Sequence, residues 1–218
     1  MFDRYFRKFL TSSNINFFFA LVLINAVVFI LNNQFILTKE LYYNSFIERL
    51  SAERIDQIVE QGRKLNFISL LFIPIVLLVK SSFTTICIFI GLIFKGFRTT
   101  YQEIFSIALK AELVFVLANV IKIFALLFFK KVDGLEDLNY YPLSLINITG
   151  TDDLYKWLVY PLQTLNLFEL GYWLLLAKGL EITCSKDFSN MLILVLSTYM
   201  LGLLIWIMIV MLFIMGIT

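Results

Sequence analysis

Long apolar stretches alternate with short polar segments along this chain. Five stretches consist mainly of apolar side chains, at about residues 15–32, 65–97, 104–129, 157–180 and 191–217. Most of them reach the roughly 20 residues that an α-helix needs to cross the hydrocarbon core of a bilayer. The pattern therefore predicts an all-α fold, a polytopic membrane helical bundle with about five transmembrane helices.

The first fourteen residues differ from the apolar stretches, because aromatic and aliphatic side chains alternate there with basic ones. This pattern is typical of a short amphipathic helix that lies at the headgroup boundary. No small-residue cleavage site comes after it, so we expect the segment to stay in the mature chain. The predicted organisation is an interfacial helix at 1–14 and a single transmembrane bundle at 15–218.

Residues 38–64 are rich in charge, and their apolar positions recur at steps of three and four. Such spacing predicts a solvated helix with one covered face. Its charged positions include Glu53, Arg54, Asp56 and Glu60. We interpret these four residues as the exposed face of a helix that can dock a partner.

Residues 65–97 allow two interpretations, a single helix kinked near Pro74 or a hairpin that turns at residues 80–82. Each half of a hairpin would rise only about 22 Å, less than the roughly 30 Å of a hydrocarbon core. The single helix is favoured, because it also continues the solvated segment before it. A long second helix that extends from the membrane into solvent is therefore expected.

Composition supports a membrane location. The chain is 60% hydrophobic and 16% charged, with a mean hydropathy of +0.86, whereas soluble domains carry about 25% charged residues. The lipid bilayer is thus the expected partner. The net charge is only +2 and the basic residues are dispersed, which argues against nucleic acid.

Histidine is absent, which removes His-ligated zinc and the Ser-His and Cys-His nucleophile systems. The two cysteines are about 100 positions apart, too distant along the chain for metal-ligand spacing. The acidic loop at 130–155 lacks the regular spacing of a calcium loop. We therefore expect a protein that is not an enzyme and that holds no metal or other cofactor.

Basic residues near the predicted helix ends indicate an orientation. Segments 1–14, 95–98 and 178–186 carry them and fall on one side of a five-helix bundle. The positive-inside rule makes that side cytoplasmic, with the carboxyl terminus extracytoplasmic. Frequent Phe, Ile, Asn and Lys suggest an AT-rich genome, so we expect a bacterial inner membrane.

Glu169 is the most unusual charge, because it falls near the middle of the fourth predicted helix. A carboxylate at mid-bilayer costs about 2.5–3.5 kcal/mol on insertion scales and should face the bundle interior with a partner. Lys122 on the third helix lies at a similar predicted depth. Asn119 and Asn166 each stand one turn before these charges, so an interhelical Glu169–Lys122 ion pair supported by two amides is expected.

The other charges within apolar sequence have simpler interpretations at the membrane boundary. Lys178 is expected to extend its ammonium to the headgroups. Lys80 is placed in the outer third of the second helix, where it would snorkel or pair with a loop acid. Lys110 and Glu112 are expected to form a pair at the inner boundary.

Two segments resemble the Yip domain family of five-span, Rab-interacting membrane proteins and their bacterial relatives. Residues 100–108, TYQEIFSIA, which come after Lys95-Gly96, resemble the start of that family's third span, and residues 166–180 resemble its fourth. The resemblance implies an integral membrane protein without catalysis, linked in eukaryotes to vesicle trafficking and membrane shaping. Glu169 and Lys178 have no counterpart in the family pattern.

These features support two functions. The first is a non-enzymatic accessory or scaffold subunit of a larger membrane complex, such as an export system, with other membrane-protein subunits as partners. It is favoured by the small size of the chain and by the solvated helix. The alternative is a small transporter or channel, with Glu169, Lys122 and Asn119 lining the path.

Overall fold

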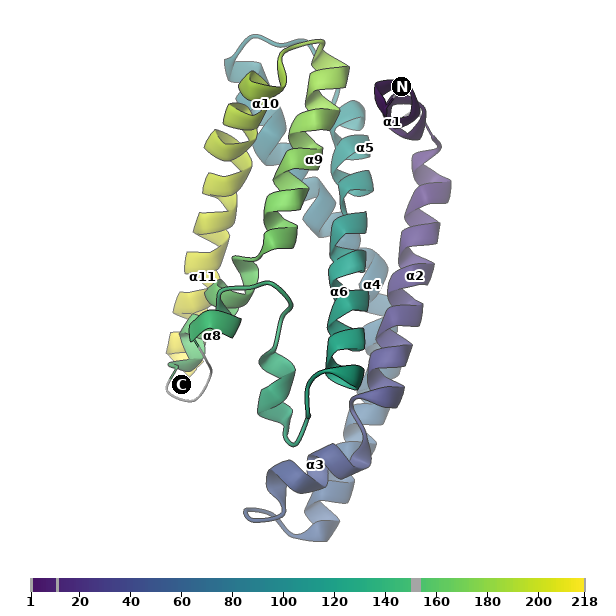
Figure 1. Cartoon of the computed structure of the whole chain (residues 1–218), viewed down its shortest axis with the longest axis vertical. Coiled ribbons are helices and arrows are strands. Elements are labelled where there is room, and N and C mark those ends of the chain that lie inside the picture. The colour runs from purple at the N-terminus through teal and green to yellow at the C-terminus, as the bar shows by residue number, and fades with distance from the viewer. Residues whose placement is uncertain (1, 11, 150–153, 218) are drawn as a thin grey trace.

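A computed structural model of the chain describes residues 2–10, 12–149 and 154–217, and side chains from residue 6 to residue 216 within these ranges. The described residues form helices and connecting loops, with a single isolated bridge between Ser144 and Asn166 and no strand. The all-α prediction is confirmed. Figure 1 shows a bundle elongated along the direction of its main helices.

The amino-terminal helices are α1 (Phe2–Leu10) and α2 (Asn14–Phe35). A helix at the amino terminus was predicted, and α1 turns sharply into α2 at the upper end of the bundle in Figure 1. Only Leu21 of α2 is buried. Phe17, Phe18 and Val22 pack against the bundle, whereas exposed residues such as Phe19 and Leu23 are available to lipid.

The second long helix is continuous. After α3 (Lys39–Phe46), Ser51 caps α4 (Ala52–Phe94) by accepting a hydrogen bond from the Arg54 amide. The 43 residues of α4 pass through Pro74 without a break and rise about 64 Å. The single-helix prediction is thus confirmed over the hairpin. In Figure 1 the amino-terminal part of α4, with α3 beside it, projects below the other helices.

The third predicted helix is divided at Glu112 into α5 (Tyr101–Ala111) and α6 (Leu113–Phe128). Thr100 and Glu103 form a reciprocal capping box that fixes the start of α5. The backbone continues in a helical conformation through Glu112. The break is therefore a local irregularity that leaves one continuous rod.

The fourth predicted helix is interrupted more strongly. Two short helices, η1 (Leu135–Asn139) and α7 (Ile146–Thr149), lie in the preceding loop. They are followed by α8 (Lys156–Thr164) and α9 (Leu167–Cys184). Asn166 has extended φ and ψ angles of −138° and 166°. The chain changes direction there, so the predicted span 157–180 is not one straight helix.

The last long helix consists of α10 (Phe188–Val195), a five-residue π-type segment η2 (Leu196–Met200) and α11 (Leu201–Ile217). Ser185 is left-handed, with φ 51°, and ends α9 before this helix begins. A π-type turn widens the helix locally. This widening lies where the helix packs against α4.

Within the described ranges, four helical segments are long and apolar enough to cross a membrane: Asn14–Phe35, Ala52–Phe94, Tyr101–Phe128 and Phe188–Gly216. The 18-residue helix α9 is not among them. It contains Glu169, Lys178 and Glu181. The membrane class predicted from the sequence is confirmed with four candidate spans.

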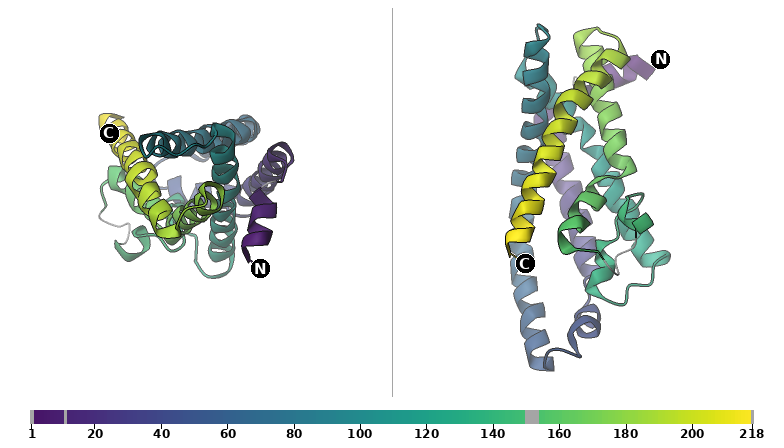
Figure 2. Two further views of the ribbon diagram at one scale, coloured as in Figure 1. Left: turned by 90° about the horizontal axis from the view of Figure 1, so that it is seen from above. Right: turned by 90° about the vertical axis from the view of Figure 1, so that its left-hand side faces the viewer.

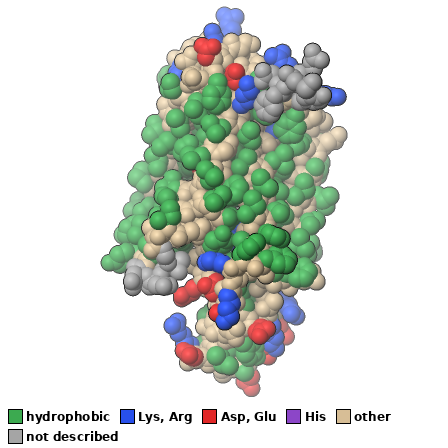
Figure 3. All heavy atoms as spheres, viewed as in Figure 1, with side chains coloured by type: hydrophobic (Ala, Val, Ile, Leu, Met, Phe, Trp, Pro, Cys, Tyr) green, Lys and Arg blue, Asp and Glu red, His purple; other side chains and the backbone are tan. Residues whose placement is uncertain are grey.

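The main apolar core joins α4, α5, α9 and α10–η2–α11. Its fully buried members include Ile88, Leu92, Ile104, Leu176, Leu180 and Leu194. Seen from above in Figure 2, α2 and α11 lie on opposite sides of the bundle. Figure 3 shows hydrophobic side chains over the middle of one face and charged side chains near its two ends. This distribution matches a protein surrounded by lipid at its middle.

Candidate functional site: a buried polar network and an adjoining cavity

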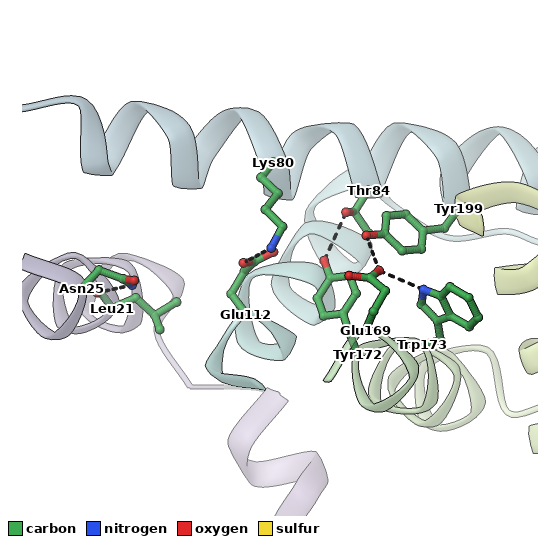
Figure 4. A network of polar contacts seen from close by, with 9 residues as sticks. All are labelled: Leu21, Asn25, Lys80, Thr84, Glu112, Glu169, Tyr172, Trp173 and Tyr199. Atoms are coloured by element: carbon green, nitrogen blue, oxygen red, sulfur yellow. Dashed lines mark hydrogen bonds and ion pairs between the residues drawn. The ribbon is translucent and has the colours of Figure 1, made fainter. Parts of the chain in front are cut away.

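Glu169 lies in the first turn of α9, where the local sequence holds it firmly. The Asn166 side chain caps the helix by accepting a 2.9 Å hydrogen bond from the Glu169 amide. The carboxylate is 5% exposed, and its Oε1 accepts 2.9 Å hydrogen bonds from Trp173 Nε1 and the Tyr199 hydroxyl (Figure 4). The helix amino terminus also favours a negative charge. Glu169 therefore connects α9 to η2.

The structure does not form the predicted ion pair between Glu169 and Lys122. Lys122 Nζ instead donates a 2.9 Å hydrogen bond to the Leu138 carbonyl, in the loop below α6. The physical reason is the break at Asn166, which starts a new helix and directs Glu169 toward η2. Asn166, one of the two amides predicted to support the pair, instead accepts a hydrogen bond from the backbone amide of Glu169.

Lys80 and Glu112 form the ion pair within the bundle, with Nζ and Oε2 2.9 Å apart. The Glu112 side chain is 5% exposed and that of Lys80 is 37% exposed. The Lys80 ammonium also stands 3.2 Å from the centre of the Phe115 ring, which stabilises the cation without neutralising it. The predicted Lys110–Glu112 pair is wrong, because the helix rod α5–α6 brings Glu112 opposite Lys80 of α4. The predicted position of these charges at the membrane boundary stays a prediction.

Lys110 is buried as well, and it does not pair with Glu112. Its ammonium donates to the carbonyls of Leu10 and Ser12, to Asn14 Oδ1 and to Ser106 Oγ. Residues 110 and 112 point away from each other because two positions on a helix differ by about 200°. Lys110 therefore fastens the α1–α2 junction to α5.

Lys178 forms a local ion pair, and its extension to the headgroups stays a prediction. Its ammonium is 2.9 Å from Glu181 Oε2, three positions further along α9, and both side chains are partly exposed. A pair at this spacing stabilises a helix by a few tenths of a kcal/mol.

Tyr172 lies between the two carboxylates (Figure 4). Its hydroxyl and Thr84 Oγ1 are 3.1 Å apart, and both residues are fully buried. Its ring contacts those of Phe115 and Tyr199, at centroid distances of 4.9 and 5.4 Å. The network thus extends from Lys80 on α4 to Tyr199 on η2.

A cavity of about 480 Å³ adjoins this network between α2, α4 and α6. Apolar residues of the three helices form most of its wall. Its polar lining residues are Asn25, Asn32, Ser69, Lys80, Glu112, Asn119 and Lys122. Lys122 and Asn119 thus line a cavity as the transporter hypothesis expected, whereas Glu169 does not line it.

The contribution of α2 was missed in the sequence, although a signal for it exists. Asn14, Asn25 and Asn32 are separated by eleven and seven positions, which are three and two helical turns and place them on one face. Asn14 bonds Ser106 and Lys110, while Asn25 and Asn32 line the cavity. An asparagine stripe in an otherwise apolar helix indicates a polar seam.

The predicted docking residues lie on the projecting part of α4. Glu53, Arg54 and Glu60 are exposed, whereas Ile55 is fully buried. Asp56 is not a free surface charge, because Lys39 Nζ lies 2.7 Å from its Oδ1 and the Tyr43 hydroxyl donates to it at 2.9 Å. The single helix predicted at 38–64 is therefore two helices, α3 and the start of α4, with exposed charges and with Leu41, Ile55 and Val59 covered.

Fold and site together define an all-α membrane protein with a half-open, mostly apolar cavity between α2, α4 and α6 that has polar side chains in its lining. Comparison with protein-family models, curated proteins and solved structures finds no match to this chain. The resemblance to the Yip domain family therefore stays a prediction.

Proposed function

We propose that this chain is an integral membrane protein without catalytic activity that carries a small polar solute across the bilayer. The observation that supports this function is the cavity between α2, α4 and α6, with its seven polar lining residues. Polar and ionisable side chains are unfavourable within membrane helices and commonly mark substrate or ion paths. A purely structural fastening needs no cavity of this size.

A second pocket on the same polar seam supports the proposal. It lies at the opposite end of α2 and is lined in part by Asn14 and Ser106. Between it and the cavity, Leu21, Leu77, Leu109 and Val116 form a small apolar cluster. Along α2 the order is polar pocket at Asn14, apolar cluster at Leu21 and cavity from Asn25 to Asn32. This order is typical of a closed path with an apolar barrier.

The proposal includes five crossings of the membrane. In Figure 1, α6 ends at the lower part of the bundle and α10 begins at its top. The chain between them must return across the same thickness, and α8 with α9 makes this return. We therefore infer that α9, although charged, is the fifth crossing, protected from lipid by its contacts with α5, α6 and α10.

The inferred location is a bacterial inner membrane with the upper end in Figure 1 facing the cytoplasm. The amino terminus, the end of α4 and the α9–α10 turn lie at that end. They carry basic residues such as Arg7, Lys8, Lys95 and Lys186. Basic residues near helix ends favour the cytoplasmic side.

Asn25 and Asn33 provide a matched test. Both donate a 2.9 Å hydrogen bond from Nδ2 to the carbonyl four residues earlier, but only Asn25 lines the cavity. Purified chain in liposomes should take up at least one member of a panel of small anions, cations and zwitterions faster than protein-free liposomes. We expect Asn25→Leu to reduce this uptake at least tenfold and Asn33→Leu to leave it within twofold. Absence of uptake across the panel would reject the function.

A second candidate function is an accessory or scaffold subunit of a membrane complex. It is favoured by the projection of α3 and α4, whose exposed charges include Glu53, Arg54 and Glu60. Purification in a mild detergent should then recover companion proteins in stoichiometric amounts. Charge reversal at Glu53 and Glu60 should release them, and a lone monodisperse chain would count against this candidate.

A further inference from the structure

We propose that the cavity between α2, α4 and α6 binds a phosphate group, which the ammonium groups of Lys80 and Lys122 in its lining attract. This inference rests on the proposed transport function, and it adds the chemical class of the solute. The charged atoms of the cavity that a ligand can reach belong to the two lysines.

The one carboxylate in the lining is not available to a ligand. Glu112 Oε2 is 2.9 Å from Lys80 Nζ. Its other oxygen, Oε1, is buried and has no hydrogen-bond partner among the described residues. The side chain is only 5% exposed. A cation entering the cavity would therefore find no accessible negative charge.

The ammonium groups, in contrast, are available. The Lys80 side chain is 37% exposed, and its contact with Phe115 leaves its charge in place. Lys122 lines the same cavity and donates one hydrogen bond, to the Leu138 carbonyl. An ammonium has three N–H donors. Both lysines can thus donate further hydrogen bonds to a ligand.

The balance of charge favours an anion. The lining holds two lysines and one glutamate, so it carries one net positive charge. A charge surrounded by apolar side chains is poorly screened and attracts a counter-ion more strongly than one in water. Charge-assisted hydrogen bonds from an ammonium to an oxyanion are among the stronger contacts in proteins.

The space is sufficient. The cavity volume of about 480 Å³ is far above the roughly 10–15 Å³ that one water requires. Asn25 adds an amide to the lining, and its Oδ1 can accept a hydrogen bond from water around the anion. The apolar wall leaves room for a short hydrocarbon part. A phosphate can therefore arrive either as a free ion or as the headgroup of an anionic lipid.

The experiment measures binding to the purified full chain in a neutral detergent at constant ionic strength. The probes are inorganic phosphate and phosphatidylglycerol, with phosphatidylcholine as the uncharged counterpart. Because a ligand that binds only the folded state raises its stability, the unfolding temperature should rise in a saturable manner with at least one anionic probe. A response to phosphatidylglycerol alone assigns the site to a lipid headgroup, and a response to phosphate assigns it to a soluble anion.

Variants locate the site. Lys122→Gln should weaken the apparent affinity at least tenfold, and so should the double variant Lys80→Gln with Glu112→Gln, which avoids leaving a buried carboxylate without its cation. Lys178→Gln is the control, because Lys178 pairs with Glu181 outside the cavity. No saturable response to either anionic probe, or an equal response in all variants, would overturn the inference.

The outcome is separable from that of the proposed function. Uptake of a cation or a neutral solute without anion binding would overturn the anion inference and leave transport standing. Saturable anion binding without uptake of any solute would support the site and reject transport.

Discussion

Glu169 illustrates how a carboxylate is accommodated inside an apolar bundle. Its Oε1 accepts hydrogen bonds from both Trp173 and Tyr199, and its backbone amide is capped by Asn166. Both side-chain donors are themselves buried. They depend on one oxygen atom, and removing that acceptor leaves two donors without a partner.

Two substitutions at Glu169 should separate the oxygen from the charge. Glu169→Leu leaves two buried donors unsatisfied and should lower the free energy of unfolding by about 2–4 kcal/mol. Glu169→Gln retains a side-chain oxygen and should lower it by less than about 1 kcal/mol. Reversible unfolding in mixed detergent measures both values. An equal loss in the two variants would show that the negative charge, and not the acceptor, stabilises the network.

The helices of the core approach one another at glycines. A Cβ built on Gly179 of α9 would lie 2.4 Å from Ile107 Cγ2 of α5. At Gly171, on the same helix, the nearest such contact is an ordinary 3.7 Å to Val114. The contact of α9 with the α5–α6 rod is therefore close at one end only.

This difference predicts opposite effects for the same substitution. Gly179→Ala should destabilise the chain by about 1–3 kcal/mol, because a β-branched neighbour must move in a packed core. Gly171→Ala should be neutral or stabilising by up to about 1 kcal/mol, since alanine favours a helix over glycine. Unfolding of the two variants in parallel tests this contrast. A neutral Gly179→Ala would mean that α9 and α5 are less tightly packed.

The attachment of α3 to α4 should depend on pH. The hydrogen bond with Asp56 raises the pKa of Lys39 above its usual 10.5. The contact between Lys39 and Asp56 therefore contributes fully to stability below pH 10.5. This contribution is lost as the pH rises through the folded-state pKa of Lys39. As the pH rises through this pKa, hydrogen exchange of the α3 amides should accelerate by more than the intrinsic effect of pH. Asp56→Asn should show faster exchange already at neutral pH, and exchange unchanged by this substitution would contradict the contact.

On the scale of the whole molecule, the two termini lie toward opposite ends of the bundle, and α3 lies at the end away from the amino terminus (Figures 1 and 2). This arrangement requires the chain between α6 and α10 to return from the lower to the upper end of the bundle in Figure 1. If α9 is the fifth crossing, α3 and the turn between α9 and α10 lie on opposite sides of the membrane.

Labelling of single cysteines tests this consequence. Cys87 and Cys184 are first replaced by serine, and a cysteine is placed at Ser45 in α3 or at Lys186 before α10. In sealed vesicles a membrane-impermeant thiol reagent should modify only one of the two. Modification of both from the same side would show that α9 does not cross.

Much of the architecture followed from local pattern. The long apolar helices, the uninterrupted α4 and the covered face near Ile55 were predicted because hydrophobic periodicity and length act within a segment. The partners of the charges within the apolar stretches were predicted wrongly. Lys80, Lys110 and Glu112 were assigned by depth alone, and depth does not say which neighbouring helix a side chain faces.

By itself, then, the sequence determined that this protein is a bundle of apolar helices with a charged segment before its second one, since hydrophobic burial and helix length are properties of each stretch of chain. Only the tertiary structure decided the partners. The break at Asn166 directed Glu169 to Tyr199, and the helix rod α5–α6 set Glu112 against Lys80. Such contacts depend on how helices rotate and pack against one another, which no single segment specifies.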